Sequence, residues 1–195
     1  SHKIYRNSII MRLGDHFKQI KKKYHNIFFS NISFDHRKIK KNYIFFAVKG
    51  NNLDGNNFIP LAIKKGCKII VTEKNFDGYK NGVLFIHTKN IRKLLAQISF
   101  SIFKKKPNNL IAVTGTNGKS SISDFYYQIL NLNNKKVASI GTLGVRSNNF
   151  NLNLLNTTID PINLSKILSK LKKKKIENVI LEASSHGLHQ NRLDG

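Results

Sequence analysis

The chain has 195 residues, 40% of them hydrophobic, which is enough for one large or two small domains with their own cores. Lys and Arg number 34 against 10 Asp and Glu, a formal net charge of +24. No apolar run reaches the roughly 18 residues of a membrane span, and no secretory leader is visible. The single cysteine, Cys67, excludes an internal disulfide and is expected to be a small buried hydrophobe. These features predict a cytoplasmic protein with no membrane partner.

The basic excess has two interpretations. The cations are mostly Lys, spread over the whole chain, and they accompany abundant Asn and Ile. Because AT-rich genomes favour these three residues, drift in composition is the preferred interpretation. The alternative is a selected surface for polyanions, which include anionic nucleotides as well as nucleic acid.

Residues 1–106 are expected to form a small α/β domain. Apolar patterns and turn residues predict strands over residues 27–34, 43–48, 67–72 and 83–86, and helices over 58–65 and 91–103. The polar stretch 104–109 contains Pro107, which stops a helix, so the domain boundary is predicted there.

Residues 107–195 are expected to form the first part of a parallel-sheet domain. The predicted order is strand 110–114, helix 120–131, strand 136–141, a polar excursion, helix 161–174 and strand 178–183. Strands that alternate with helices predict a parallel sheet, with its ligand at the carboxyl ends of the strands. Asp160 is expected to cap the helix that begins at Pro161. Three strands are few for such a sheet, and the third is expected to leave an exposed edge; with a first residue that is not Met, this predicts a fragment.

A glycine-rich loop joins the first of these strands to its helix, which is the context of a phosphate-binding loop. Its glycines allow successive N–H groups to face one anion, and the helix N-terminus adds positive charge. Lys119 is expected to reach the β- and γ-phosphates of ATP, and the Ser120 hydroxyl to bind Mg²⁺. The predicted cofactor-binding residues are Gly115, Thr116, Asn117, Gly118, Lys119, Ser120 and Ser121. Val113 replaces the first glycine of the general pattern, so the alternative is a glycine turn before a basic helix start.

Four further segments are weak when each is taken alone. They are Phe34-Asp35-His36-Arg37 with the later Asn51-Asn52-Leu53-Asp54-Gly55, then Asn156-Thr157-Thr158, Leu181-Glu182-Ala183-Ser184-Ser185-His186-Gly187-Leu188, and Gln190-Asn191-Arg192. A strand-end carboxylate such as Glu182 is more often a surface group than a metal ligand, and a lone histidine is more often structural.

Taken in order, these segments resemble the Mur ligases, and most closely the branch that adds the third amino acid to the peptidoglycan precursor. In that branch a strand delivers T-G-T-N-G-K-[ST], a T-T segment follows, and E-[VA]-S-S-H-[GA]-L-x-Q-x-R closes the run. The preceding domain carries D-S-R and a D-G loop. The resemblance covers nearly all of residues 30–195, and His36 departs from it because the family usually has serine there.

The resemblance implies an ATP-dependent ligase that forms an amide through an acyl phosphate, with ATP and Mg²⁺ as cofactors. Lys119 and Glu182 would be catalytic, and Ser120 and Glu182 would bind the metal. The substrates would be UDP-N-acetylmuramoyl-L-alanyl-D-glutamate and an amino acid, with meso-diaminopimelate as the more frequent choice. Substrate binding would fall to Phe34, His36, Asn51, Asn52, Leu53, Asn156, Thr157, Thr158, Ser184, Gln190 and Arg192.

In that family further metal ligands and a third domain lie downstream, so this chain alone is expected to be inactive. A monomer that binds no nucleic acid is expected. The alternatives are another Mur-type ligase, a folylpolyglutamate-type ligase, or a basic nucleic-acid-binding NTPase.

Overall fold

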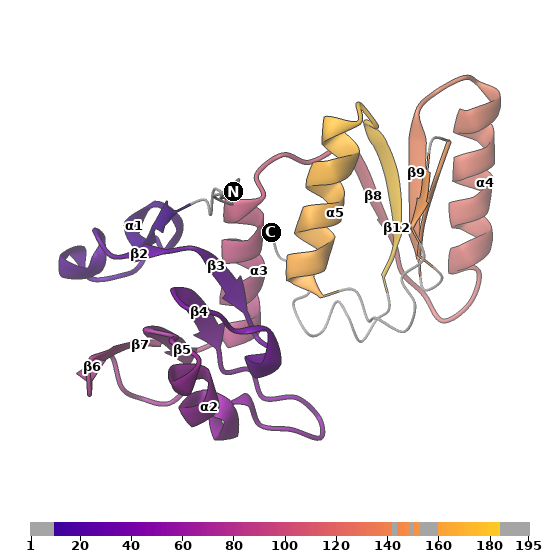
Figure 1. The fold of residues 1–195 in the computed structure, drawn as a ribbon. Coiled ribbons are helices and arrows are strands. Elements are labelled where there is room, and N and C mark those ends of the chain that lie inside the picture. The colour runs from indigo at the N-terminus through magenta and orange to yellow at the C-terminus, as the bar shows by residue number, and fades with distance from the viewer. Residues whose placement is uncertain (1–9, 142–143, 149, 153–159, 184–195) are drawn as a thin grey trace, which may run out of the picture. The chain divides into compact units, whose positions relative to one another are not determined.

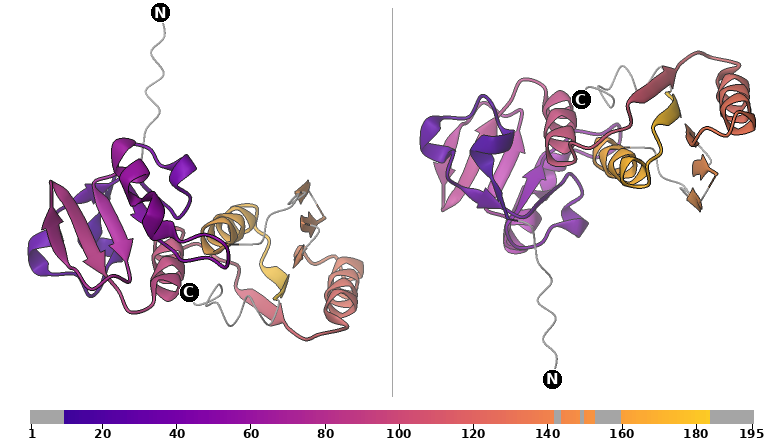
Figure 2. Two further views of the ribbon diagram at one scale, coloured as in Figure 1. Left: turned by 90° about the horizontal axis from the view of Figure 1, so that it is seen from below. Right: turned by 90° about the horizontal axis from the view of Figure 1, so that it is seen from above.

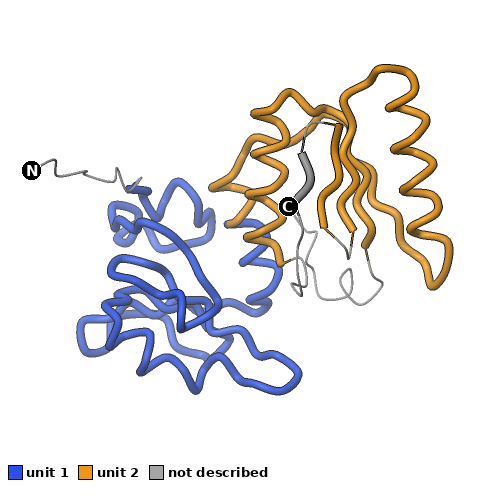
Figure 3. Tube along the Cα trace, turned by 45° about the vertical axis from the view of Figure 1, so that its right-hand side comes forward, with its two compact units in different colours: residues 1–98 blue, residues 99–195 orange. Residues whose placement is uncertain are grey.

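The computed structural model describes residues 10–141, 144–148, 150–152 and 160–183. The chain divides into two compact units, residues 1–98 and 99–195 (Figure 3). Both units combine helices with largely parallel sheets, which confirms the predicted α/β fold class. The division falls inside the helix α3 (Ile91–Ile102), and the predicted boundary after residue 106 stays a prediction.

The first unit is built on a five-stranded sheet of order β3-β4-β5-β7-β6 (Figure 1). Its strands are β3 (Asn31–Ser33), β4 (Tyr43–Phe46), β5 (Ile69–Thr72), β6 (Gly78–Lys80) and β7 (Val83–His87). All neighbours are parallel except β6, which runs antiparallel to β7. The central strands β4 and β5 are almost wholly buried, as expected where both faces of a parallel sheet are covered. Helix α2 (Ile59–Lys64) follows a 3₁₀ turn, η3 (Gly55–Phe58).

The prediction of one strand over residues 27–34 is wrong. Phe28 and Phe29 form β2 (Phe28–Phe29), which pairs with β1 (Met11–Arg12) in a separate two-stranded sheet. Ser30 interrupts the run, because its N–H donates to the carbonyl of Asn42 before β3 begins. The sequence pattern also missed β1, β6 and the short turns α1 (Leu13–His16), η1 (Lys22–Tyr24) and η2 (His36–Lys38), which are too short for a periodic signal.

Cys67 precedes β5 and is buried, as the sequence predicted. Its thiol lies 3.1 Å from the carbonyl oxygens of Tyr43 and Ile69, and burial raises its pKa. It therefore packs as a core side chain.

The second unit holds a five-stranded sheet of order β11-β10-β9-β12-β8. Its strands are β8 (Asn109–Val113), β9 (Val137–Gly141), β10 (Gly144–Ser147), β11 (Phe150–Leu152) and β12 (Asn178–Glu182). Helices α4 (Lys119–Leu132) and α5 (Pro161–Lys173) lie on opposite faces of this sheet (Figures 1 and 2). The α5 face is a buried apolar cluster in which Leu164, Leu168 and Leu171 pack on Val179 and Leu181. Asp160 accepts a 2.9 Å hydrogen bond from the N–H of Asn163 and caps α5, as predicted.

The third parallel strand does not lie at the sheet edge, contrary to the sequence prediction. Because α5 crosses the face opposite α4, the chain returns toward β8, and β12 inserts between β8 and β9 with parallel pairing to both. The two edge strands are β11 and β8, and four of the five residues of β8 are exposed. The predicted polar excursion contains β10 and β11, which continue the sheet antiparallel beyond β9.

Candidate active site

Three strand ends meet at one edge of the second unit's sheet. Glu182 at the end of β12 lies opposite Val113 of β8, and Leu181 lies opposite Ile140 of β9. Gly141 therefore sits beside Glu182, and the glycine loop 114–118 leaves β8 at the same edge before α4 begins. Open α/β sheets bind their ligands at this edge.

The glycine loop has a backbone that requires two of its glycines. Gly115 has φ 150° and Gly118 has φ 80°, conformations that side chains with a Cβ rarely adopt. Gly118 is the N-cap of α4 and offers no side-chain acceptor to the N–H groups of the first turn. Those groups remain available to an anion. Lys119 Nζ donates a hydrogen bond to the carbonyl of Gly115, which keeps the ammonium group over the loop.

Ser120 and Glu182 come together across this edge. Ser120 Oγ donates a 2.9 Å hydrogen bond to Glu182 Oε2. An alcohol and a carboxylate oxygen are hard ligands of the kind Mg²⁺ accepts, and Mg²⁺ commonly takes one or two protein ligands beside water and phosphate oxygens. The described residues contain no group of three or more His, Cys, Asp or Glu side chains able to hold a metal. The pair therefore fits an ion that is completed by the phosphates of a nucleotide.

Residues of α4 and β10 also form a network that the sequence did not indicate. The Arg146 guanidinium lies 4.1 Å from the centre of the Tyr127 ring and pairs with Asp124 at 2.8 Å. These contacts connect β10 to α4 one to two turns beyond the glycine loop. Ser123, on the same helix, is buried, and its hydroxyl has no partner among the described residues.

In the first unit, two loops leave the same edge of neighbouring parallel strands. Ser33 of β3 lies opposite Phe45 of β4, and the chain continues from these strands into residues 34–38 and 47–54. Phe34 is 37% exposed at the start of the first loop. His36 stacks on Phe58, with ring centres 4.1 Å apart and planes within 6°. The sequence did not indicate Phe58, whose position in an Asn-Asn-Phe run carries no motif.

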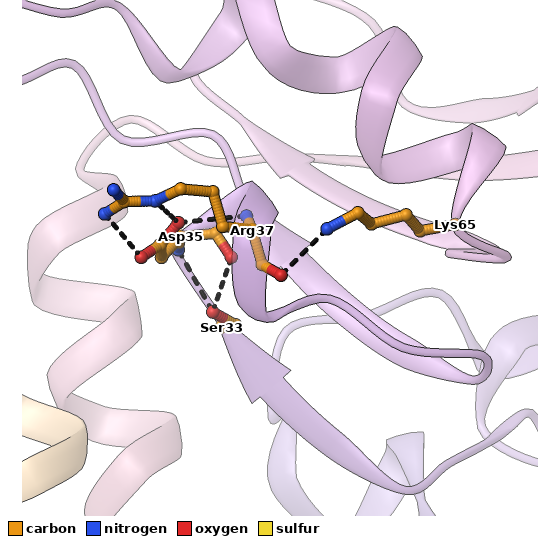
Figure 4. Close-up of polar contacts among 4 residues, drawn as sticks. All are labelled: Ser33, Asp35, Arg37 and Lys65. Atoms are coloured by element: carbon orange, nitrogen blue, oxygen red, sulfur yellow. Dashed lines mark hydrogen bonds and ion pairs between the residues drawn. The ribbon is translucent and has the colours of Figure 1, made fainter.

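Asp35 fixes the loop that carries His36 (Figure 4). Its Oδ1 accepts hydrogen bonds from the N–H and Nε of Arg37, and its Oδ2 accepts from Nη2, each at 2.9 Å. Ser33 Oγ bridges the N–H and carbonyl of Asp35 at 3.0 Å, and Lys65 Nζ donates to the carbonyl of Arg37 at 2.8 Å. The side-chain hydrogen bond with Arg37 is the main reason that the pKa of Asp35 lies below its usual value.

The second loop is a tight turn whose tip is exposed. The N–H of Gly50 donates to the carbonyl of Leu53 at 2.8 Å, and Lys49 forms an antiparallel bridge with Asp54. The three predicted substrate-binding residues at the tip, Asn51, Asn52 and Leu53, are all exposed.

Asp54 fixes the end of this turn. Its Oδ1 accepts hydrogen bonds from the N–H and Nδ2 of Asn56, both at 2.8 Å, and the pKa of Asp54 is lowered by them. Asn56 Oδ1 in turn accepts from Thr72 Oγ1 at the end of β5, at 2.8 Å. The loop base is therefore held to the sheet edge.

The structure thus places the predicted residues in two groups, one on each unit. Gly115 to Ser121 lie with Glu182 at one sheet edge, and Phe34 and His36 leave the same edge as Asn51 to Leu53 in the other unit. Asn156, Thr157, Thr158, Ser184, Gln190 and Arg192 lie outside the described residues. Within the part of the chain that is described, no helix is long and apolar enough to cross a bilayer.

Two family models match the chain, one to each unit. The Mur ligase family catalytic domain matches residues 29–101, and the Mur ligase middle domain matches residues 113–195.

Curated relatives are similar over most of the chain. The UDP-N-acetylmuramoyl-L-alanyl-D-glutamate--2,6-diaminopimelate ligase of Rickettsia conorii is 42% identical over 176 residues, which are 87% of this chain and 35% of that protein. The ligase of the same name from Wigglesworthia glossinidia brevipalpis is 40% identical over 175 residues, or 85% of this chain and 35% of that protein. The chain spans about a third of the length of these relatives.

A solved structure of a ligase with that name superposes on 96% of this chain and 38% of its own, with a TM-score of 0.78 and 26% identity. The MurF ligase from Thermotoga maritima in complex with ADP shares the fold at a TM-score of 0.51 and 21% identity, over 80% of this chain and 32% of that one.

Proposed function

Because the chain belongs to the Mur ligase family, we propose that it contributes the nucleotide and UDP-sugar sites of an ATP-dependent ligase. The reaction attaches meso-diaminopimelate to UDP-N-acetylmuramoyl-L-alanyl-D-glutamate in peptidoglycan synthesis. Relatives of that name at 42% and 40% identity support this choice of reaction. The observation that carries it is the Ser120–Glu182 hydrogen bond beside the glycine loop, because it joins two oxygen ligands to a phosphate-binding backbone.

The chemistry begins with a carboxylate, which is a poor electrophile until one of its oxygens becomes part of a leaving group. The substrate carboxylate attacks the γ-phosphate of ATP to form an acyl phosphate and ADP, and the incoming amine then displaces phosphate to form the amide. Lys119 would stabilise the negative charge on the transferred phosphoryl group, and the loop N–H groups would orient the nucleotide. Ser120 and Glu182 would hold Mg²⁺, which neutralises phosphate charge when bound.

The first unit would hold the UDP end of the substrate. Phe34 and His36 leave the sheet edge beside the turn that carries Asn51, Asn52 and Leu53, and the His36–Phe58 stack supplies a flat surface at this edge. Asn156, Thr157, Thr158, Ser184, Gln190 and Arg192 would contact the muramoyl peptide, with Arg192 pairing with a substrate anion.

The protein would act in the cytoplasm as a monomer and bind no nucleic acid. Its scattered lysines argue against a nucleic-acid partner, because nucleic-acid sites gather basic and aromatic side chains on one face.

Ligand titrations followed by NMR test the proposed function. Mg-ATP is expected to shift amides of residues 115–121 and Glu182. The UDP-muramoyl dipeptide is expected to shift Phe34, His36 and residues 51–53. Tetrahydropteroate, the substrate class of a folylpolyglutamate-type ligase, is expected to shift neither group. Absence of Mg-ATP binding, or shifts with the folate in place of the UDP ligand, would contradict the proposal.

A further inference from the structure

Gly141 lies where a larger residue would meet the Glu182 carboxylate. A Cβ at position 141 would stand 2.8 Å from Oε1 and 3.1 Å from Cδ of Glu182. Unlike Gly115 and Gly118, Gly141 has no left-handed φ, so its backbone is open to any residue. Glycine is therefore favoured at position 141 because a side chain there would collide with the Glu182 carboxylate.

The carboxylate of Glu182 occupies the space beside Gly141 in one orientation. Glu182 Oε2 accepts the hydrogen bond from Ser120, while Oε1 is turned toward Gly141. The carboxylate is thus held between the start of α4 and the end of β9. Because it is the far end of a flexible side chain, a methyl group at position 141 would turn it aside without requiring the strands to move.

We infer that Gly141 is a positioning residue, which keeps the Glu182 carboxylate directed at Ser120 and so sets the Mg²⁺ dependence of nucleotide binding. This inference rests on the proposed function, because it assigns Gly141 a role only where Ser120 and Glu182 share an ion. Gly141 itself touches neither nucleotide nor ion; it acts through the carboxylate.

The test compares four forms of the full 195-residue chain: wild type, Gly141→Ala, Glu182→Ala and the double variant. Calorimetry gives the affinity for ATP with Mg²⁺ and with EDTA, and the ratio of the two reports the contribution of the metal. Loss of a group that orients a metal ligand commonly costs 10- to 100-fold in metal affinity. We expect Gly141→Ala to lower the ratio about tenfold and to leave metal-free ATP binding unchanged. In the Glu182→Ala background the same change is expected to have no further effect.

A second readout needs no ligand. In the metal-free chain, Gly141→Ala should shift the Ser120 amide, and it should not do so when Glu182 is already alanine. Circular dichroism should show all four forms folded, since the side-chain tip can move aside.

The outcomes are distinct. An unchanged ratio in Gly141→Ala, or an equal loss in both backgrounds, would overturn the inference and leave the proposed function standing. Unfolding of Gly141→Ala would overturn it too, because it would show that the backbone needs the glycine. Failure of the wild-type chain to bind Mg-ATP would overturn the proposed function and this inference with it.

Discussion

Ser120 and Glu182 are 62 residues apart in sequence, yet their side chains are joined by a 2.9 Å hydrogen bond. Ser120 is the second residue of α4, and Glu182 is the last residue of β12. The bond connects the start of the helix to the carboxyl end of a strand that lies between β8 and β9, so the two proposed oxygen ligands are adjacent before a nucleotide arrives.

Ser120→Ala and Ser120→Thr should differ in their affinity for Mg-ATP. Ser120→Ala removes the hydroxyl, and we expect Mg-ATP affinity to fall at least about tenfold. Ser120→Thr keeps a hydroxyl at the same position and should retain affinity within about threefold of wild type. Calorimetry with Mg-ATP measures both. Equal Mg-ATP affinity in the two variants would contradict the assignment of the Ser120 hydroxyl to the metal site.

Lys119→Ala should abolish Mg-ATP binding and leave the fold intact. Its ammonium group donates a hydrogen bond to the Gly115 carbonyl of its own loop, so the free energy of unfolding should change by about 0.5 kcal/mol or less. Lys135→Ala is the matched control, an exposed lysine beyond the far end of α4 that should leave affinity unchanged. Undiminished affinity in Lys119→Ala, or an equal loss in both variants, would contradict the phosphate-binding loop.

The Asp35–Arg37 pair should make the first unit less stable as the pH falls into the acid range. The pKa of Asp35 is lowered in the folded state, so its contribution is complete above the unfolded pKa of about 3.9 and is lost as pH falls through the folded pKa. Asp35→Asn should therefore cost about 1 kcal/mol or less at pH 7. The unfolding free energies of variant and wild type should converge below pH 4.

Denaturant unfolding at several pH values tests this prediction. Asp15→Asn is the control, since the Arg12–Asp15 pair is about half exposed on both sides and should contribute less. A difference between wild type and Asp35→Asn that grows toward low pH would have the wrong sign for a lowered pKa.

Gly55→Ala should destabilise the first unit more than Gly50→Ala. A Cβ at Gly55 would lie 2.5 Å from the carbonyl oxygen of Val48 and 2.7 Å from two further backbone atoms. Backbone cannot turn aside as a side chain can, so we expect a loss of about 2 kcal/mol. At Gly50 the only contact is the Leu53 carbonyl oxygen at 3.3 Å, and the loss should stay below about 1 kcal/mol. Thermal unfolding ranks the two, and the reverse order would contradict the close approach at Gly55.

Despite its net charge of +24, the chain is not expected to bind nucleic acid tightly. Duplex DNA is expected to bind loosely and to lose its affinity steeply as salt rises, because scattered lysines make only phosphate contacts. The UDP-muramoyl dipeptide should bind with a weaker salt dependence. Tight DNA binding that persists at physiological salt would favour the nucleic-acid-binding alternative.

The elements that the sequence predicted well are those with a continuous pattern. Strands β4, β5, β7, β8, β9 and β12 and helices α3, α4 and α5 all lie within the predicted segments or within two residues of them. Each is either a short apolar run or an amphipathic helix, and both patterns are local. The split of residues 27–34 was missed because Phe28 and Phe29 look like a strand, and the sequence does not say that their partner is β1.

The site divides in the same way. The glycine loop could be predicted because Gly115, Gly118 and Lys119 lie within a run of five residues, and the two glycines serve the local backbone conformation. The contribution of Gly141 and the stacking of Phe58 on His36 depend on which strands and turns become neighbours. The position of β12 between β8 and β9 likewise follows from the face that α5 crosses, which the order of elements leaves open.

The position of β12 between β8 and β9 has a further consequence. It pairs with β8, which delivers the glycine loop, and with β9, which ends at Gly141, so one strand aligns the loop, Gly141 and Glu182 through two parallel ladders. A strand advances about 3.3 Å per residue, and only a slip of two residues keeps each side chain on its face. The smallest such error would move Glu182 by about 7 Å from Ser120. The alignment of Glu182 with Ser120 is therefore all-or-none, set by whole steps of the strand pairing, with no graded intermediate.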